Sequence, residues 1–351
     1  MASPVAAAPE GQLDALFLPF VQGELALPAA ARVLFLRARG GYRMREWAGP
    51  GWLCEQGFKP FADDLERAGF TVGEPTAGDR YDRVLMLPPR QREEARAVFA
   101  RAAHHASPGG CVLAAVPNAE GAKSAEADFA RLFGSVRSLS KHKCRVFWAA
   151  VGDRMDHELL DQWIVSDEPR RTADGYLSRP GLFSWDRIDP ASALLAAHLP
   201  VDLRGRLADL GAGYGYLSAQ AIARCPAVTS VDLYEAQARA LGPAQANLDE
   251  AITASGRKMD TRVLWHDVTR GLPHRYDAIV SNPPFHQGRA DLPELGRAFI
   301  TAAAAALHPG GRLWMVANRH LPYEATLDSC FAQVRTVATQ DGFKVIEAVL
   351  A

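Results

Sequence analysis

The chain has 351 residues, 48% of them hydrophobic, which is enough for two domains of ordinary size with separate cores. The formal net charge of −1 excludes nucleic-acid binding through overall positive charge, so any RNA contact must depend on local basic clusters. No apolar run approaches the roughly 18 residues of a membrane-spanning helix, so we expect no membrane partner.

The N-terminal residues Met1-Ala2-Ser3-Pro4 lack the basic start and apolar core of a signal peptide. The chain has no Cys-x-x-Cys pair among its five scattered cysteines, Cys54, Cys111, Cys144, Cys225 and Cys330. This pattern is typical of reduced, mostly buried thiols and not of a metal site. We therefore expect a cytoplasmic protein without a bound metal.

Two basic clusters without any acid lie in the first half of the chain. The first spans 14 residues and comprises Arg32, Arg37, Arg39, Arg43 and Arg45. The second spans 15 residues and comprises Arg131, Arg137, Lys141, Lys143 and Arg145. Each cluster is either an RNA-contacting surface or a solvated face. We expect Lys141 and Lys143 to contact RNA, because Arg145 is placed on a strand.

A glycine loop in the second half joins a strand to a helix. Arg206–Leu210 has the apolar character of a buried strand that ends in Asp209-Leu210, and Leu217–Ala223 is an apolar helical stretch. Between them stand Gly211, Gly213 and Gly215, at alternate positions. This spacing suits a nucleoside without a pyrophosphate, because a dinucleotide site has G-x-G-x-x-G. A tight turn is the alternative.

Acidic residues follow the next two predicted strands. Val228–Glu235 ends in an acid about twenty residues after the loop, which is the distance at which an acid can accept from both hydroxyls of a ribose. Glu235 stands before a predicted helix at Ala236–Leu248, whereas Asp232 is placed in mid-strand. Asp267 follows a third strand, where it can accept from an adenine amino group or act as a helix N-cap.

The most informative motif is Ser281-Asn282-Pro283-Pro284-Phe285, directly after the strand Tyr276–Val280. Pro283 and Pro284 fix φ and donate no N–H, so nearby carbonyls can point at the site. The amide of Asn282 and these carbonyls can accept the hydrogens of an exocyclic amino group. The ring of Phe285 can stack on the flat ring that carries the amino group.

This half of the chain resembles the class I S-adenosylmethionine-dependent methyltransferases over Arg206 to Ala351. The resemblance implies that S-adenosylmethionine binds at Asp209, Gly211, Gly213, Gly215, Glu235, Asp267 and Asn282. Asn-Pro-Pro-Phe marks the members that methylate adenine N6, guanine N2 or the glutamine amide of release factors. The hairpin expected at Val334–Thr339 and Phe343–Leu350, with Asp341-Gly342 as its turn, agrees with the antiparallel last strand of that fold.

Further motifs resemble the small-subunit ribosomal RNA methyltransferase C family, which makes N2-methylguanosine in 16S rRNA. They are Leu177–Ser184, Ile188-Asp189, Asn282–His286, Val316-Ala317-Asn318, Leu321-Pro322-Tyr323 and Phe343-Lys344-Val345. The resemblance implies a ribosomal RNA substrate within a subunit. A large-subunit guanine-N2 enzyme, a protein glutamine-N5 methyltransferase and a non-catalytic ribosome assembly factor remain alternatives.

The resemblance also implies roles at the acceptor side. Asn282 and the carbonyl of Pro283 would accept the two amine hydrogens, and Phe285 would stack the base. Pro284 and His286 would contact the substrate, with His286 more suited to a supporting hydrogen bond than to a general base. We expect a monomer.

An internal repeat of about two hundred residues links the two halves. The matching pairs include Tyr81-Asp82 with Tyr276-Asp277, Pro88-Pro89 with Pro283-Pro284, and Pro108-Gly109-Gly110 with Pro309-Gly310-Gly311. The first copy has Leu87 at the position of Asn282 and Arg90 at the position of Phe285. We therefore predict an α/β chain of two tandem Rossmann-like methyltransferase domains with mostly parallel, seven-stranded sheets and an antiparallel last strand. Residues 1–165 would be a degenerate scaffold or RNA-contacting copy, and residues 166–351 the catalytic one.

Overall fold

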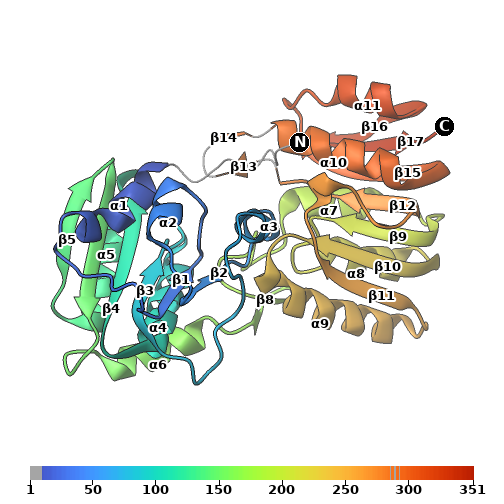
Figure 1. The fold of residues 1–351 in the computed structure, drawn as a ribbon. Coiled ribbons are helices and arrows are strands. Elements are labelled where there is room, and N and C mark those ends of the chain that lie inside the picture. The colour runs from blue at the N-terminus through green and yellow to red at the C-terminus, as the bar shows by residue number, and fades with distance from the viewer. Residues whose placement is uncertain (1–9, 285, 288–289, 292) are drawn as a thin grey trace. The chain divides into compact units, whose positions relative to one another are not determined.

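The computed structural model describes residues 10–284, 286–287, 290–291 and 293–351, and the chain forms two compact units (Figure 1). The first unit ends at Glu168 and the second begins at Pro169. Among the described residues, no helix is both long and apolar enough to cross a membrane.

The first unit alternates helices with strands. Its helices are α1 (Glu10–Val21), α2 (Tyr42–Trp47), α3 (Lys59–Arg67), α4 (Arg92–His105), η1 (Asn118–Glu120), α5 (Ala122–Phe133) and α6 (His157–Ser166). Its strands are β1 (Val33–Leu36), β2 (Trp52–Glu55), β3 (Tyr81–Met86), β4 (Ala106–Pro117), β5 (Arg137–Lys141) and β6 (Cys144–Ala150).

The second unit alternates in the same way. Its helices are α7 (Pro190–His198), α8 (Tyr216–Arg224), α9 (Ala238–Ser255), η2 (Val268–Arg270), α10 (Pro293–Ala306) and α11 (Glu324–Cys330). The strands of its main sheet are β9 (Arg204–Leu210), β10 (Ala227–Glu235), β11 (Asp260–Trp265), β12 (Tyr276–Ser281), β15 (Leu307–Asn318), β16 (Gln333–Gln340) and β17 (Phe343–Val349). Two short hairpins pair β7 (Arg170–Arg171) with β8 (Leu177–Ser178), and β13 (His286–Gln287) with β14 (Ala290–Asp291).

Both main sheets are mostly parallel, which confirms the predicted fold class. The second sheet has the strand order β11-β10-β9-β12-β15-β17-β16, and β17 runs antiparallel to both of its neighbours. The first sheet has the order β2-β1-β3-β4-β6-β5, with β6 antiparallel to both neighbours. It therefore has six strands in the described residues, not the expected seven. An isolated parallel bridge between Cys54 and Val72 stands where a strand equivalent to β11 would pair.

The repeat between the two units extends to strand register. In the first unit Cys111 pairs with Ala150, and in the second Arg312 pairs with Val349. Strands β4 and β15 both have 12 residues, and β6 and β17 both have 7. The first glycine of each Pro-Gly-Gly turn has a left-handed φ, 73° at Gly109 and 76° at Gly310, which glycine adopts without steric cost. The same turn chemistry therefore starts the same strand in both units.

Helices cover both faces of the second sheet (Figure 1) because residues alternate between faces along each parallel strand. Leu207 and Val280 face the cluster that contains residues of α7, α8 and α9. Ala208 and Ile279 face the cluster that contains residues of α10 and α11. Burial on both faces fixes the register of the central strands, and so fixes where their carboxyl ends lie.

The terminal hairpins of the two units use different turn residues in the same geometry. The β16–β17 turn is Asp341-Gly342, with φ of 51° and 83°, as the Asp-Gly signal predicts. The β5–β6 turn is His142-Lys143, with φ of 54° and 58°. Residues that carry a side chain are strained in the left-handed region. In the first unit these two residues place basic side chains at the end of the hairpin.

Candidate functional site

The carboxyl ends of four neighbouring strands bring the candidate residues together. The register aligns Tyr234 of β10 and Ser281 of β12 with Leu210 of β9. The residues that follow these strands therefore lie side by side at one edge of the sheet. In spatial order they are Asp267 after β11, Glu235 at the end of β10, the glycine loop after β9 and Asn282 after β12. Ligands of open α/β sheets bind at this edge.

The glycine loop is fixed to the neighbouring strand by its backbone. The N–H groups of Gly211 and Ala212 both donate to the carbonyl of Tyr234, at 2.9 and 3.2 Å. The three glycines have φ of 71°, 55° and 86°, in the left-handed region that favours glycine. A Cβ at Gly215 would lie 3.3 Å from Leu233 Cδ2, whereas a Cβ at Gly213 would meet nothing within 4 Å. Gly215 thus permits close packing, and Gly213 borders open space.

Glu235 holds the loop from the next strand. Its Oε2 accepts from the Gly213 N–H at 2.8 Å, and its Oε1 accepts from the Gln237 N–H at 2.7 Å. The side chain is buried, and burial raises the pKa of its carboxyl. Each carboxylate oxygen still has a lone pair for a ligand hydroxyl. Asp232, by contrast, lies inside β10 and accepts from Arg206, Arg262 and Tyr276.

Two carboxylates at this edge each have a buried oxygen without a hydrogen-bond partner among the described residues, Asp209 Oδ1 and Asp267 Oδ2. The other oxygen of Asp209 accepts from Ser218 N–H and Oγ–H at 3.1 and 2.7 Å, and burial raises the pKa of Asp209 to about 7. The other oxygen of Asp267 accepts from Thr269 N–H at 3.0 Å and caps η2. Asp267 Oδ2 also lies 3.7 Å from Arg270 Nε in an ion pair, whereas no such partner is present for Asp209 Oδ1 in the described residues. An unsatisfied buried acceptor costs about 1–3 kcal/mol, so the Asp209 position favours a ligand that carries donors.

The amide of Asn282 has a defined orientation. Its Nδ2 donates to Asp189 Oδ2 at 2.9 Å and to Ser192 Oγ at 2.8 Å. A carboxylate can only accept, so Nδ2 and not Oδ1 must face Asp189. Both amide hydrogens are used in these bonds, and Oδ1 is left as the acceptor for a ligand. Ser281 joins β12 to β9 beside this amide, because its Oγ donates to the Leu210 carbonyl at 2.8 Å.

The rest of the Asn-Pro-Pro-Phe-His motif is only partly described. Pro283 is buried and Pro284 is exposed. Phe285 lies outside the described residues, so its stacking role stays a prediction. The backbone of His286 pairs with Asp291 in the β13–β14 hairpin, and its side chain is not described.

The two partners of Asn282 are functional candidates that the Asn-Pro-Pro motif does not indicate. The sequence places Asp189 only within a family pattern, and that pattern does not include Ser192. A local signal does exist, because Asp189-Pro190 with a serine three residues after Asp189 is a strong helix start. In the structure Asp189 Oδ2 accepts from the Ser192 N–H at 2.8 Å and caps α7.

Most members of the basic clusters have acidic partners. Arg32 pairs with Asp79, Arg37 with Glu94, Arg43 with Asp14 and Glu46, Arg131 with Asp128, Arg137 with Glu24, and Arg145 with Glu126. Within the described part of the chain, Lys141 and Lys143 have no such partner, and both are exposed. Lys141 ends β5 and Lys143 lies in the β5–β6 turn, next to Cys144, which pairs with Pro117 at the carboxyl end of β4. Their charge is therefore available to a ligand at that edge of the first sheet.

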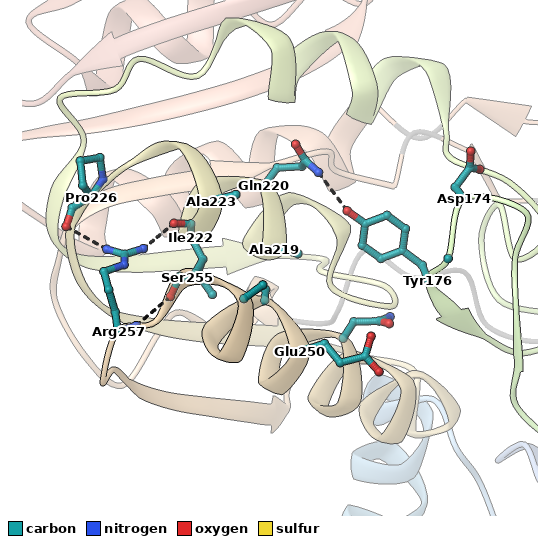
Figure 2. A pocket seen from close by; sticks show the side chains of 14 residues that line it. Asp174, Tyr176, Ala219, Gln220, Ile222, Ala223, Pro226, Glu250, Ser255 and Arg257 are labelled. Carbon is teal, nitrogen blue, oxygen red and sulfur yellow. Dashed lines mark hydrogen bonds between the residues drawn. The ribbon is translucent and has the colours of Figure 1, made fainter.

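A separate cavity of about 590 Å³ lies between α8 and α9 (Figure 2). Its lining includes Tyr176, which accepts from Gln220 Nε2 at 2.9 Å through its hydroxyl oxygen. Arg257 donates to the carbonyls of Ile222 and Pro226, so backbone acceptors already occupy its guanidinium (Figure 2). None of the acids at the sheet edge lines this cavity. No group of three potential metal ligands occurs in the described residues either.

Comparison with known proteins gives a consistent result. Residues 175–347 match the model of the methyltransferase small domain family. A ribosomal RNA small subunit methyltransferase C of Shewanella baltica is 30% identical over 276 residues, which cover 78% of this chain and 77% of that protein. The protein of the same name from Psychromonas ingrahamii is 28% identical over 273 residues, or 77% of this chain and 76% of that protein.

A similar fold occurs in a solved structure of a 16S rRNA N2 methyltransferase from T. thermophilus in complex with AdoMet and guanosine. It superposes with a TM-score of 0.78 and 24% identity, over 98% of this chain and 93% of that one. The similarity therefore covers both units and not only the second.

Proposed function

The chain belongs to the ribosomal RNA small subunit methyltransferase C family, and we propose that it methylates the exocyclic N2 of a guanine in 16S rRNA. Its enzyme class is S-adenosylmethionine-dependent methyltransferase. The observation that carries the choice of acceptor is the amide of Asn282, whose Oδ1 is left as a hydrogen-bond acceptor beside the glycine loop. An acceptor there suits an amino group as the methylated atom.

The residues at the sheet edge fit S-adenosylmethionine. This molecule carries an ammonium group, two ribose hydroxyls and an adenine amino group, and all of them donate hydrogen bonds. We propose that Glu235 accepts from the hydroxyls, Asp267 from the adenine amine and Asp209 from the ammonium. Asp209 Oδ1 and Asp267 Oδ2, which have no hydrogen-bond partner in the described residues, and the open space at Gly213 support this assignment, although Asp267 Oδ2 also pairs with Arg270. When bound, S-adenosylmethionine supplies a methyl group that its sulfonium already activates.

The chain's own residues would mainly orient the acceptor. The lone pair of a guanine amino group is delocalised into the ring. Acceptance of its two hydrogens by Asn282 Oδ1 and the Pro283 carbonyl favours a tetrahedral nitrogen with an available lone pair. The proton can leave to water after the N–C bond forms, so no strong base is required. We propose that Phe285 stacks the base once it has left its helix or loop.

Methyl-transfer assays with labelled S-adenosylmethionine test this function. Substrates are small subunits, large subunits, naked 16S rRNA and a release factor, and digestion of labelled RNA to nucleosides identifies the modified base. We expect label in small-subunit or 16S RNA, recovered as N2-methylguanosine. Label in the release factor favours the glutamine-N5 alternative, and label in the large subunit favours the large-subunit enzyme. Tight binding to a ribosomal particle without turnover on any substrate favours an assembly factor.

We also propose that the first unit supplies RNA affinity while the protein acts as a monomer in the cytoplasm. Replacing Lys141 and Lys143 by alanine should weaken RNA binding by about 1 kcal/mol per lost phosphate contact and flatten the salt dependence, because fewer counterions are released. Affinity measured at several salt concentrations checks this result. Cofactor affinity should not change.

Arg80→Ala with Arg154→Ala is the matched control for the two lysines. It also removes two exposed positive charges, but from the opposite edge of the first sheet, before β3 begins and after β6 ends. We expect this control to keep the affinity and the salt slope of the unmodified protein. Equal effects of the two double variants would mean that the β5–β6 turn is only a solvated face.

A further inference from the structure

The side chain of Asn282 is held from a helix that precedes it by about ninety residues in sequence. Asp189 caps the N-terminus of α7, and Ser192 lies in the first turn of that helix. The helix is anchored, because Ala191, Leu195 and Ala196 are buried in the cluster that contains Trp314, Val316 and Val345. The hydrogen bonds to Asn282 therefore come from a fixed element.

The chemistry of the two partners selects one orientation of the amide. An amide side chain can rotate by 180° and exchange its oxygen for its NH2 group with little change of shape. With the NH2 group toward the acceptor site, the amide would oppose an amino group donor to donor. The carboxylate of Asp189 accepts only, so it stabilises the orientation in which Oδ1 faces the acceptor site. Its negative charge also polarises the amide, which makes Oδ1 a stronger acceptor.

The same segment contacts the glycine loop. The hydroxyl of Tyr214, inside the loop, donates to the carbonyl of Arg187 at 3.2 Å. Arg187 stands two residues before Asp189. Residues 187–192 therefore contact both the loop that borders the expected cofactor site and the amide that faces the acceptor.

We infer that Asp189 and Ser192 are positioning residues that fix the amide of Asn282 with Oδ1 toward the amine to be methylated. This inference rests on the proposed function, because it assigns to Asn282 the acceptor role given there. It predicts that Asp189 affects turnover through Asn282 and not through the stability of α7 alone. The same atom, Asp189 Oδ2, accepts from the Ser192 N–H and from Asn282 Nδ2, so Asp189→Asn can keep both hydrogen bonds through its own Oδ1, whereas Asp189→Ala removes the helix cap and the partner of the amide together.

Single substitutions give the first test. We expect Asp189→Ala to lower kcat by about 10- to 100-fold, because it removes the acceptor that fixes the amide of Asn282, and Asp189→Asn and Ser192→Ala to lower it by smaller factors. The dissociation constant for S-adenosylmethionine should stay near that of the unmodified protein. Asp156→Ala is the matched control for the lost helix cap, because Asp156 caps α6 through the Leu159 N–H at 2.9 Å in the other unit. It should leave kcat unchanged.

A double substitution that exchanges the amide of Asn282 with the carboxylate of Asp189 gives the decisive test. Asn282→Asp alone places two carboxylates within hydrogen-bond distance of each other, and their repulsion should abolish most activity. Adding Asp189→Asn restores one amide and one carboxylate, and leaves a carboxylate oxygen facing the acceptor. We expect the double variant to turn over at least tenfold faster than Asn282→Asp. If Asp189 were only a helix cap, the double variant would be no faster than Asn282→Asp, and this result would overturn the inference.

The outcomes separate the inference from the proposed function. Unmodified protein that methylates no guanine N2 in any ribosomal substrate contradicts the proposed function. Unmodified protein that turns over normally, with a double variant no better than Asn282→Asp, contradicts only the positioning role of Asp189.

Discussion

Asn282→Ala is expected to lower the rate of methyl transfer by at least about two to three orders of magnitude, with cofactor binding nearly intact. The substitution removes Oδ1, the acceptor that the geometry leaves facing the amine. It does not touch Glu235 or Asp267, which we expect to hold the nucleoside. Single-turnover rates on the ribosomal substrate measure the loss, and calorimetry with S-adenosylmethionine measures the binding.

Asn118→Ala is the control for this substitution. It makes the same chemical change after β4 of the first unit, outside the Asn-Pro-Pro motif of the sequence. We expect its turnover to match that of the unmodified protein. Normal turnover by Asn282→Ala would show that the amide is not needed, and the proposed acceptor chemistry would have to be abandoned.

The fold could be read from the sequence because its signals are local. Asp341-Gly342 specifies a two-residue hairpin turn, and the Pro-Gly-Gly turns start β4 and β15 in both copies. Helix α9 differs from the predicted Ala236–Leu248 at both ends, because it begins at Ala238 and extends to Ser255. Residues 249–255 contain no helix-breaking signal, and the left-handed Gly256 after them ends the helix.

The absence of a seventh strand from the first sheet, in the described residues, could not be predicted from such local signals. A repeat predicts equal strand numbers, but only a single bridge forms at Val72 in the described residues. The segment around it contains Gly73, Pro75 and Gly78. Proline and glycine weaken strand pairing, so this edge of the sheet stays short.

The candidate site likewise has one part that the sequence predicts and one part that it does not. The motif residues lie at strand ends, and the order of parallel strands brings strand ends together, so their meeting could be predicted. The orientation of Asn282 could not be predicted, because its partner Asp189 lies 93 residues away in the chain. A helix cap is a local signal, and nothing in it shows that the same carboxylate oxygen also accepts from a distant amide.

Gly213→Val is expected to weaken S-adenosylmethionine binding by at least about 100-fold. A Cβ at this glycine meets no protein atom within 4 Å, so a valine side chain would extend into the open space beside the loop. Glu235 and Asp267 stand on the next two strands, which makes this space the expected place of the nucleoside. Calorimetry should show one binding site per chain in the unmodified protein and none at accessible concentrations in the variant.

We expect a single S-adenosylmethionine site per chain because of the side chains that follow β1 in the first unit. After β1 the chain continues with Arg37-Ala38-Arg39, and the Arg37 N–H donates to Glu55 Oε2 at 3.1 Å, as Gly213 does to Glu235 in the second unit. Here, however, the Arg39 guanidinium lies 3.1 Å from the centre of the Phe61 ring. Side chains thus occupy the region after β1 that glycines leave open after β9. Two equivalents of cofactor bound per chain would contradict this interpretation.

Gly256→Val separates blocked binding from backbone strain. Gly256 has φ of 66°, close to the 55° of Gly213, and a Cβ there also meets nothing within 4 Å. Valine in the left-handed region costs about 1–2 kcal/mol at either position, so both variants should lose similar thermal stability. Only Gly213→Val should lose the cofactor, because Gly256 ends α9 and lies away from the carboxyl edge of the sheet. Equal losses of binding in the two folded variants would mean that strain, and not occupied space, is responsible.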